Sequence, residues 1–132
     1  MDIQLKRGLL DICVLRVLEN GDSYGYQIIK DISPYISITE STLYPILKRL
    51  EGAQCLEVYS VEHNSRLRKY YRITEVGVNK VKEFIEEWEE VMQVYNFIAS
   101  KSDTYDGIDI VDKDLDTGNN SNKEEMYNLE QV

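Results

Sequence analysis

Three side chains that can hydrogen-bond to a polar ligand, Thr42, Tyr44 and Lys48, fall on one side of the segment from Ser41 to Glu51. Helical spacing puts them on an outer face and gathers four apolar side chains into an inner stripe, Leu43, Ile46, Leu47 and Leu50. Pro45 gives this helix a rigid, slightly bent start, just past the first turn, where its missing N–H costs less. A helix with a polar and aromatic leading end suits entry into a DNA groove. An amphipathic surface helix without that role is the alternative for this segment taken alone.

A basic hairpin is predicted downstream of this helix. Runs of β-branched and aromatic residues at Leu56–Glu62 and Lys69–Thr74 flank a polar turn at 63–68. Four basic side chains gather in and beside that turn: Arg66, Arg68, Lys69 and Arg72. A charge cluster alone is usually a solvated surface, but one on a hairpin beside a candidate recognition helix more often contacts phosphates. Helix, turn, helix and basic hairpin is the order of a winged helix-turn-helix.

Four blocks of sequence occur in the order and spacing of a known family. They are Gly25-Tyr26-Gln27-Ile28, Thr42-Leu43-Tyr44-Pro45 with Arg49-Leu50-Glu51, Arg68-Lys69-Tyr70-Tyr71, and Ile73-Thr74 with Gly77. In these blocks the first hundred or so residues resemble the PadR family of transcriptional regulators, in its small subfamily with one C-terminal dimerisation helix. The chain departs from the family pattern at Arg66-Leu67, where the wing tip usually has glycine or proline. It also departs at Ala53-Gln54-Cys55, where a glycine usually follows the third helix.

Pattern and resemblance together predict a mainly α fold with a small β-hairpin. We expect a winged helix-turn-helix domain at 1–75, a C-terminal dimerisation helix at 76–100 and a disordered acidic tail at 101–132. The expected function is that of a homodimeric transcriptional repressor, released from DNA by a small-molecule effector. Its partner would be a double-stranded DNA operator, contacted through Thr42, Tyr44, Lys48, Arg66, Arg68, Lys69 and Tyr70. Two alternatives are a winged-helix module that binds protein and not DNA, and a carrier of apolar ligands.

The net charge of −9 does not exclude a DNA-binding protein, because the charge is unevenly distributed. The tail at 101–132 carries nine acidic and three basic side chains, and residues 83–100 add five glutamates. Residues 1–82 hold twelve basic and ten acidic side chains, a net charge of +2. Screening limits charge interactions to about 8 Å at physiological salt, so local charge decides the attraction to phosphate. The tail itself has too few apolar side chains to offset the entropy cost of folding.

Two helices are more apolar than one small domain can cover. The first is apolar nearly all round from Leu9 to Leu18, so it needs a second covering surface. The last carries a seam with alternating spacings of three and four, Val81, Phe84, Trp88, Val91, Tyr95 and Ile98. We therefore predict a homodimer whose interface includes Leu9, Val81, Phe84, Ile85, Trp88, Met92 and Tyr95.

Trp88 is the only tryptophan of the chain and lies in the middle of this seam. In multidrug-sensing relatives, a tryptophan at the matching place lines a pore between the subunits and stacks on planar aromatic compounds. The resemblance therefore implies an effector pocket formed by Leu5, Ile12, Trp88 and Val91, with a planar aromatic ligand. The alternative is a packed core aromatic, which is the commoner use of such a residue.

No catalytic, metal or cofactor site is expected. His63, the only histidine, lies in the predicted polar turn without a nucleophile at readable spacing, and no Cys/His metal cluster is found. The glycines at 21 and 25 belong to a helix–helix turn, with Asp22 or Ser23 capping a second helix over Tyr24–Ile32. Because neither a signal peptide nor a run of eighteen apolar residues is found, we expect a cytoplasmic protein without membrane contact.

Overall fold

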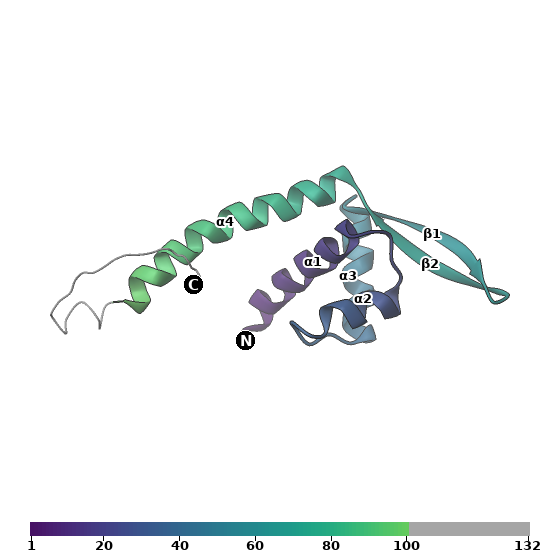
Figure 1. Cartoon of the computed structure of the whole chain (residues 1–132), viewed down its shortest axis with the longest axis horizontal. Coiled ribbons are helices and arrows are strands. Elements are labelled where there is room, and N and C mark those ends of the chain that lie inside the picture. Colours follow the sequence, from purple (N-terminus) through teal and green to yellow (C-terminus); the bar gives the residue numbers. More distant parts are fainter. Residues whose placement is uncertain (101–132) are drawn as a thin grey trace. The chain divides into compact units, whose positions relative to one another are not determined.

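A computed structural model describes residues 1–100, and the acidic tail predicted at 101–132 lies outside them. The elements follow one another as α1 (Ile3–Glu19), α2 (Gly25–Ile32), α3 (Glu40–Gly52), β1 (Leu56–His63), β2 (Arg66–Ile73) and α4 (Glu75–Ala99) (Figure 1). This is the predicted mainly α fold with one small hairpin. Residues 1–87 form one compact unit that includes the first half of α4, and α4 from Trp88 onward belongs to a second unit.

The core of the first unit lies between α1, α2 and α3, and the base of the hairpin closes it. Apolar side chains converge there from every element of this unit, Leu10, Val14, Leu15, Leu18, Ile28, Ile32, Ile38, Leu43, Ile46, Leu47, Leu50, Cys55, Leu56, Tyr71 and Val81. α1 begins where the Asp2 carboxylate accepts a hydrogen bond from the Leu5 amide at 3.0 Å. Its flanks carry Ile12 and Val17, which pack against the core but stay partly exposed. α1 therefore has more apolar surface than this core covers.

α3 has the buried stripe that its sequence predicts. The side chains of its inner face are at most 3% exposed, Leu43, Ile46, Leu47 and Leu50. The predicted outer residues Thr42, Tyr44 and Lys48 are all exposed. The helix begins after Thr39, whose hydroxyl contacts the hydroxyls of Ser41 and Thr42 at 3.1 and 3.2 Å and does not bond to the backbone. The segment therefore presents an intact polar face to solvent.

The predicted capping of α2 is wrong. The helix starts at Gly25, one residue later than expected, and the residue before it makes no side-chain capping bond. Ser23 instead exchanges two backbone hydrogen bonds with Tyr71, at 2.7 and 3.1 Å. The Asp22 carboxylate is bound by side chains of the hairpin. Both candidate caps are thus bonded to residues that lie 37 to 50 positions further along the chain.

The hairpin is longer, and its turn shorter, than the sequence predicts. The strands pair without interruption from Leu56 opposite Ile73 to His63 opposite Arg66. Only Asn64 and Ser65 remain in the turn, both with positive φ, 52° and 65°. Positive φ at both central residues is the geometry of a type I′ turn, in which asparagine is favoured. The predicted turn at 63–68 is therefore wrong, since His63 belongs to β1 and Arg66, Leu67 and Arg68 belong to β2.

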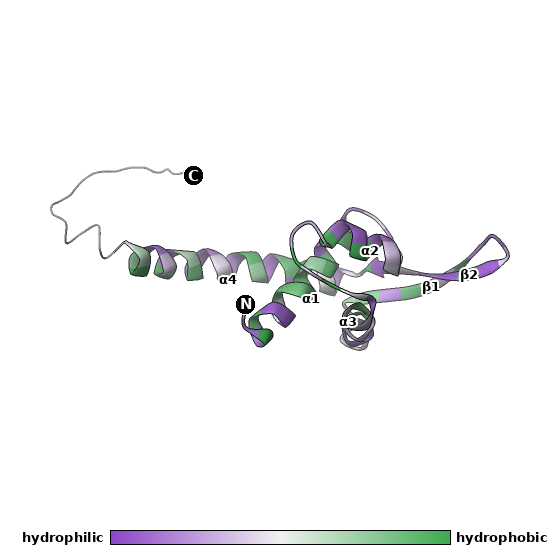
Figure 2. Cartoon of the chain, turned by 90° about the horizontal axis from the view of Figure 1, so that it is seen from below, coloured by the Kyte–Doolittle hydropathy of each residue, from purple (hydrophilic) through white to green (hydrophobic). Residues whose placement is uncertain are grey.

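The first turn of α4 is packed tightly against the segment that follows α3. The Thr74 hydroxyl donates to the Gln54 carbonyl at 2.6 Å and accepts from the Gly77 amide at 3.2 Å. The Thr74 amide donates to the Cys55 carbonyl at 3.0 Å. Hydrophobic and hydrophilic residues then alternate along α4 (Figure 2). Within residues 1–100, no helix combines the length and the apolar character that crossing a bilayer would require.

Gly77 offers a direct test of this packing. A Cβ at this position would overlap the Cys55 carbonyl oxygen and lie 2.7 Å from the Ile73 Cγ1. Because the backbone cannot move aside cheaply, Gly77→Ala should lower the free energy of unfolding by about 1–3 kcal/mol. Gly8→Ala is the matched control, since nothing lies within 4 Å of its Cβ position. It should raise the free energy by about 0.5–1 kcal/mol. Urea unfolding of both variants measures the pair, and equal stability of Gly77→Ala and wild type would contradict the close packing.

Candidate nucleic-acid interface

The exposed face of α3 lies between two hollows in the surface. Thr42 lines the hollow that opens toward α1, and Tyr44 lines the one that opens toward the hairpin. Lys48 is exposed on the same helix one turn further along. The three polar residues predicted on this helix are therefore accessible to a ligand large enough to cover both hollows.

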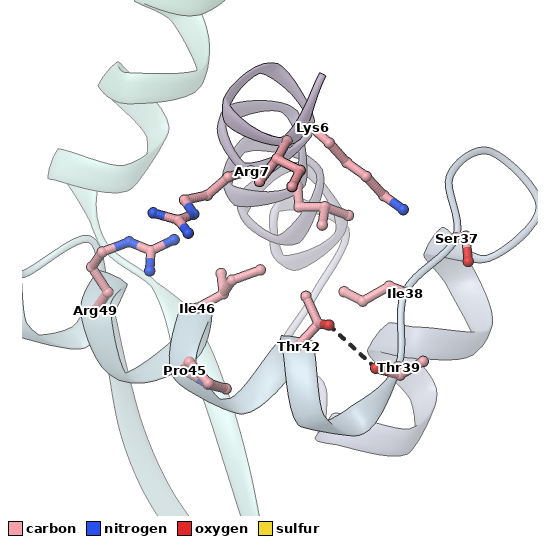
Figure 3. A pocket seen from close by; sticks show the side chains of 11 residues that line it. Lys6, Arg7, Ser37, Ile38, Thr39, Thr42, Pro45, Ile46 and Arg49 are labelled. Atoms are coloured by element: carbon pink, nitrogen blue, oxygen red, sulfur yellow. Dashed lines mark hydrogen bonds between the residues drawn. The ribbon is translucent and has the colours of Figure 1, made fainter. Parts of the chain in front are cut away.

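The hollow on the α1 side has a volume of about 490 Å³. Its apolar floor includes Leu10 and Ile46, and Lys6 and Arg7 reach into it from α1 (Figure 3). In Figure 3, the guanidinium of Arg7 extends toward the same end of the hollow as that of Arg49. Whereas the Arg49 Nη2 is paired with the Asp11 carboxylate at 2.6 Å, no residue from 1 to 100 forms an ion pair with Lys6 or Arg7.

Lys6 and Arg7 are candidate site residues that the sequence reasoning missed. The signal was present, because two adjacent basic side chains precede the apolar stretch of α1. Their significance depends on α1 lying beside α3, which sequence periodicity does not reveal. Two unpaired cations next to an exposed polar helix face form a surface suited to an anion.

The cleft on the hairpin side, of about 600 Å³, is rich in tyrosine. Its lining residues come from the start of α2, from α3 and from β2, namely Tyr24, Gly25, Tyr26, Glu40, Tyr44, Leu67, Arg68, Lys69 and Tyr71. The Tyr44 hydroxyl lies where a Cβ at Gly25 would be. Only glycine at position 25 lets the ring lie this close to the start of α2. Tyr44 is 47% exposed, and its hydroxyl sits beside α2.

Two of the predicted wing contacts, Arg68 and Tyr70, have partners within the protein. The Arg68 guanidinium lies 4.0 Å from the centroid of the Tyr24 ring and donates to the Tyr70 hydroxyl at 3.4 Å. The Tyr70 ring packs between the rings of Tyr24 and Tyr59, at centroid distances of 5.5 and 5.7 Å. A cation over an aromatic face is attracted by the ring's quadrupole, so this arginine is held in place. The Arg68 guanidinium therefore stays charged while its position is restrained.

Arg72 is also held, by an acidic residue of the α1–α2 turn. Its Nε and Nη2 lie 3.1 and 3.0 Å from Asp22 Oδ2. The Tyr59 hydroxyl donates to the same oxygen at 2.6 Å. This hydrogen bond, followed by the bond and charge of Arg72, holds the pKa of Asp22 below its ordinary value of 3.8. The same hydrogen bond raises the pKa of Tyr59, because its proton is shared with a carboxylate.

Arg66 and Lys69 complete the wing, and both are exposed. Within residues 1–100 neither forms an ion pair. Of the four basic residues that the sequence groups in the wing, Arg68 and Arg72 therefore have partners that attach the hairpin, and Arg66 and Lys69 have no ion-pair partner within residues 1–100. Alternation along β2 explains part of this division, because Arg68 and Arg72 share one face of the strand and Lys69 lies on the other.

The residues predicted for the effector pocket fall in both units. In the first unit, Ile12 lines an apolar hollow of about 470 Å³, together with Leu9, Cys13, Val17, Ile32, Tyr35 and Phe84. Leu5 is 42% exposed. Burial raises the pKa of the Cys13 thiol. In the second unit, Trp88 is half-buried and Val91 is exposed along α4. No group of three His, Cys, Asp or Glu side chains in residues 1–100 is arranged to hold a metal ion.

One residue of the predicted dimer seam is misplaced. Val81 is only 3% exposed and belongs to the core of its own chain, so its side chain cannot meet a partner. The spacing of three and four could not separate a side chain that packs inward from those that face out. The other predicted seam residues remain at least partly accessible, Leu9, Phe84, Ile85, Trp88, Met92 and Tyr95.

Comparisons with known proteins agree with this architecture. The model of the PadR-like family of transcriptional regulators matches residues 14–83. An uncharacterised protein X of Lysinibacillus sphaericus is 39% identical over 93 residues, which are 67% of this chain and 85% of that protein. The solved structure of a transcriptional regulator from Clostridium thermocellum is 38% identical, with a TM-score of 0.66, and the match covers 73% of this chain and 95% of that one.

A more distant relative has the same fold. Bacillus subtilis PadR, solved in complex with operator DNA, is 22% identical, with a TM-score of 0.56. The match covers 58% of this chain and 46% of that one, and it supports the winged-helix fold alone. The family model spans α2, α3 and the hairpin, which line the hairpin-side cleft, and it includes α3 but not the start of α1 from the other hollow. With more than half of its length matched, this chain belongs to the PadR-like family of transcriptional regulators.

Proposed function

We propose that this protein is a homodimeric, DNA-binding repressor that inserts α3 into the major groove and lays the wing along the adjacent backbone. One observation carries the proposal: the exposed face of α3 is flanked on both sides by cations that have no ion-pair partner in residues 1–100. They are Lys6 and Arg7 on the α1 side, Lys48 on α3 itself, and Arg66 and Lys69 on the wing. This arrangement matches a duplex, in which phosphates border both edges of the groove.

Each group of residues has a distinct role in this proposal. Thr42 meets base edges in the groove, since hydroxyls can donate to and accept from several bases. Tyr44 contacts a base edge or an adjacent phosphate from the hairpin-side cleft that it lines. The five unpaired cations neutralise phosphates, and Arg68 reaches the backbone from its fixed position over Tyr24. A repressor role follows if the operator overlaps a promoter.

The runner-up function is a winged-helix module that binds another protein. Such a module has no need for unpaired cations and would be expected to pair its basic groups internally. Arg49, Arg68 and Arg72 do have internal partners. The five cations around α3 do not, and this favours a polyanionic ligand.

Salt dependence of DNA binding tests the proposal. Each neutralised phosphate contributes about −0.9 to the slope of log affinity against log salt. Lys69→Ala should flatten that slope by about 0.9 per subunit and weaken operator and random duplexes alike. Lys80→Ala, an exposed lysine of α4 that lines neither hollow, is the control and should leave the slope unchanged. Fluorescence anisotropy with a duplex from upstream of the protein's own gene measures both. An unaltered slope in Lys69→Ala would remove the wing from the interface, and absence of binding by the wild type would favour the protein-binding module.

Dimerisation is proposed through the exposed apolar side chains of α4. Ile85, Met92 and Tyr95 are 52%, 45% and 57% exposed in the single chain. Exposed apolar surface of this extent on one helix indicates a partner surface. Two-fold symmetry also suits an operator with two half-sites about one helical turn apart.

A charge placed in the seam should dissociate the dimer. Tyr95→Lys would bury an ammonium group in the apolar interface, so sedimentation equilibrium should show a shift toward monomer. Gln93→Lys adds the same charge on the opposite side of α4, because two residues are about 200° apart on a helix. It should leave the mass unchanged. If both variants sediment like the wild type, α4 is not the interface.

The proposed effector is a planar aromatic compound that binds at Trp88 and releases the protein from DNA. A planar aromatic compound that stacks on Trp88 should quench its fluorescence and lower operator affinity, since a ligand shifts DNA binding only by preferring one state. Trp88→Ala should then keep operator affinity and lose the response. Anisotropy titrations with a panel of planar aromatic dyes measure both effects. Unresponsive wild-type fluorescence, with the blue-shifted emission of a dry indole, would make Trp88 a core residue.

A further inference from the structure

We infer that Asp22 is a positioning residue for the wing: it sets DNA affinity by fixing the orientation of the hairpin, without touching DNA. The inference rests on the proposed DNA-binding function and adds a residue whose charge is opposite to that of a DNA contact. Asp22 lies in the turn between α1 and α2, next to the base of the hairpin.

A single carboxylate oxygen ties both strands of the hairpin to the helices. Asp22 Oδ2 accepts from the Tyr59 hydroxyl of β1 at 2.6 Å and from the Arg72 Nε of β2 at 3.1 Å. The Arg72 Nη2 lies 3.0 Å from the same oxygen. Tyr59 pairs with Tyr70 across the hairpin, and Arg72 pairs with Glu57, so the two contacts grip different rungs of the ladder. Together with the two backbone hydrogen bonds between Ser23 and Tyr71, these contacts attach the hairpin at more than one point, which restricts its rotation.

The two residues that follow Asp22 also hold the wing. The backbone of Ser23 exchanges two hydrogen bonds with Tyr71, which anchors the base of β2. The Tyr24 ring packs edge-on against Tyr70 and under the Arg68 guanidinium. Three consecutive residues of one turn therefore account for the backbone, ionic and aromatic contacts of the hairpin with the helices. Among these, the ionic contact alone reaches both strands through side chains.

The length of the hairpin makes this contact matter. Strands rise about 3.3 Å per residue, so Lys69 lies about 10 Å and Arg66 about 20 Å beyond Arg72. A tilt of about 10° at the base would move the tip by about 3 Å, which is the length of a hydrogen bond. Side chains from Ser60 to Leu67 are all exposed, so within residues 1–100 the tip beyond the Arg68–Tyr24 contact has no attachment of its own and follows the base of the hairpin. The phosphate contacts of the wing thus depend on its attachment.

The direction of the change in DNA affinity, when the charge of Asp22 is removed, distinguishes positioning from simple electrostatics. Asp22 is an anion near a surface proposed to bind a polyanion, and removing its charge should by itself tighten DNA binding. The same change would release Arg72, a cation, which again should tighten binding. Positioning predicts the reverse, because a wing that samples several orientations is competent for only a fraction of the time.

The test uses Asp22→Asn in the full-length chain, with the duplex from upstream of its own gene and a random duplex of equal length. Affinity should fall about tenfold, corresponding to a wing correctly oriented about a tenth of the time. The salt slope should stay unchanged, since no phosphate contact is deleted. Tyr59→Phe removes one of the three bonds and should cause a smaller loss of affinity. Tighter binding by Asp22→Asn, or a flattened slope, would overturn the inference.

Two controls distinguish a loss of wing positioning from a loss of folding and from a failure of the proposed DNA-binding function. Asp31→Asn removes the same charge from an exposed side chain of α2 whose hydrogen-bond partner within residues 1–100 is Gln27, and it should not weaken binding. Hydrogen exchange of the Tyr71 amide, bonded to the Ser23 carbonyl at 2.7 Å, needs no DNA. It should be faster in Asp22→Asn while the amides of α1 and α3 stay protected. Unchanged exchange at Tyr71 would refute the positioning role even if the wild type bound no DNA. Wild-type failure to bind DNA together with faster exchange would refute the proposed function alone.

Discussion

The burial of Tyr71 is the contact on which the wing depends. This side chain extends from β2 into the helical core and is 5% exposed, and its backbone N–H and C=O both form hydrogen bonds with Ser23. Burial raises the pKa of its hydroxyl. A two-stranded hairpin is at best marginally stable in water. The strands here persist because the base of the hairpin belongs to the core, through Tyr71 and Leu56, while the rest extends into solvent.

That attachment divides the basic residues into two groups. Arg68 and Arg72 point to the face of the hairpin that meets the α1–α2 turn, where a tyrosine ring and a carboxylate hold them. Lys69 lies on the other face, toward α3. The positive charge available to an external ligand is therefore smaller than the sequence suggests but better defined in position. Lys6 and Arg7 lie on the α1 side of α3, so positive charge that is unpaired within residues 1–100 borders this helix on two sides.

The apolar side chains are likewise divided between those buried in the core and those left exposed on the surface. α1 buries one side in the core and leaves Ile12 and Leu9 beside an apolar hollow. α4 buries Val81 and leaves Ile85 and Met92 exposed. A chain with a single small core satisfies only part of its apolar surface. The remaining surface is the physical reason for expecting a second copy.

Sequence patterns alone were enough to predict the elements and their order. The stripe from Leu43 to Leu50, the two runs of the hairpin and the family blocks are local patterns, and local periodicity follows directly from backbone geometry. The partners of individual polar groups, by contrast, depend on how the elements pack in three dimensions. Asp22 bonds residues 37 and 50 positions away, and therefore does not cap α2. Val81 is buried, and Lys6 and Arg7 lie beside α3, for the same kind of reason. Whether a charge is paired or free depends on neighbours distant in sequence, and no spacing rule encodes them.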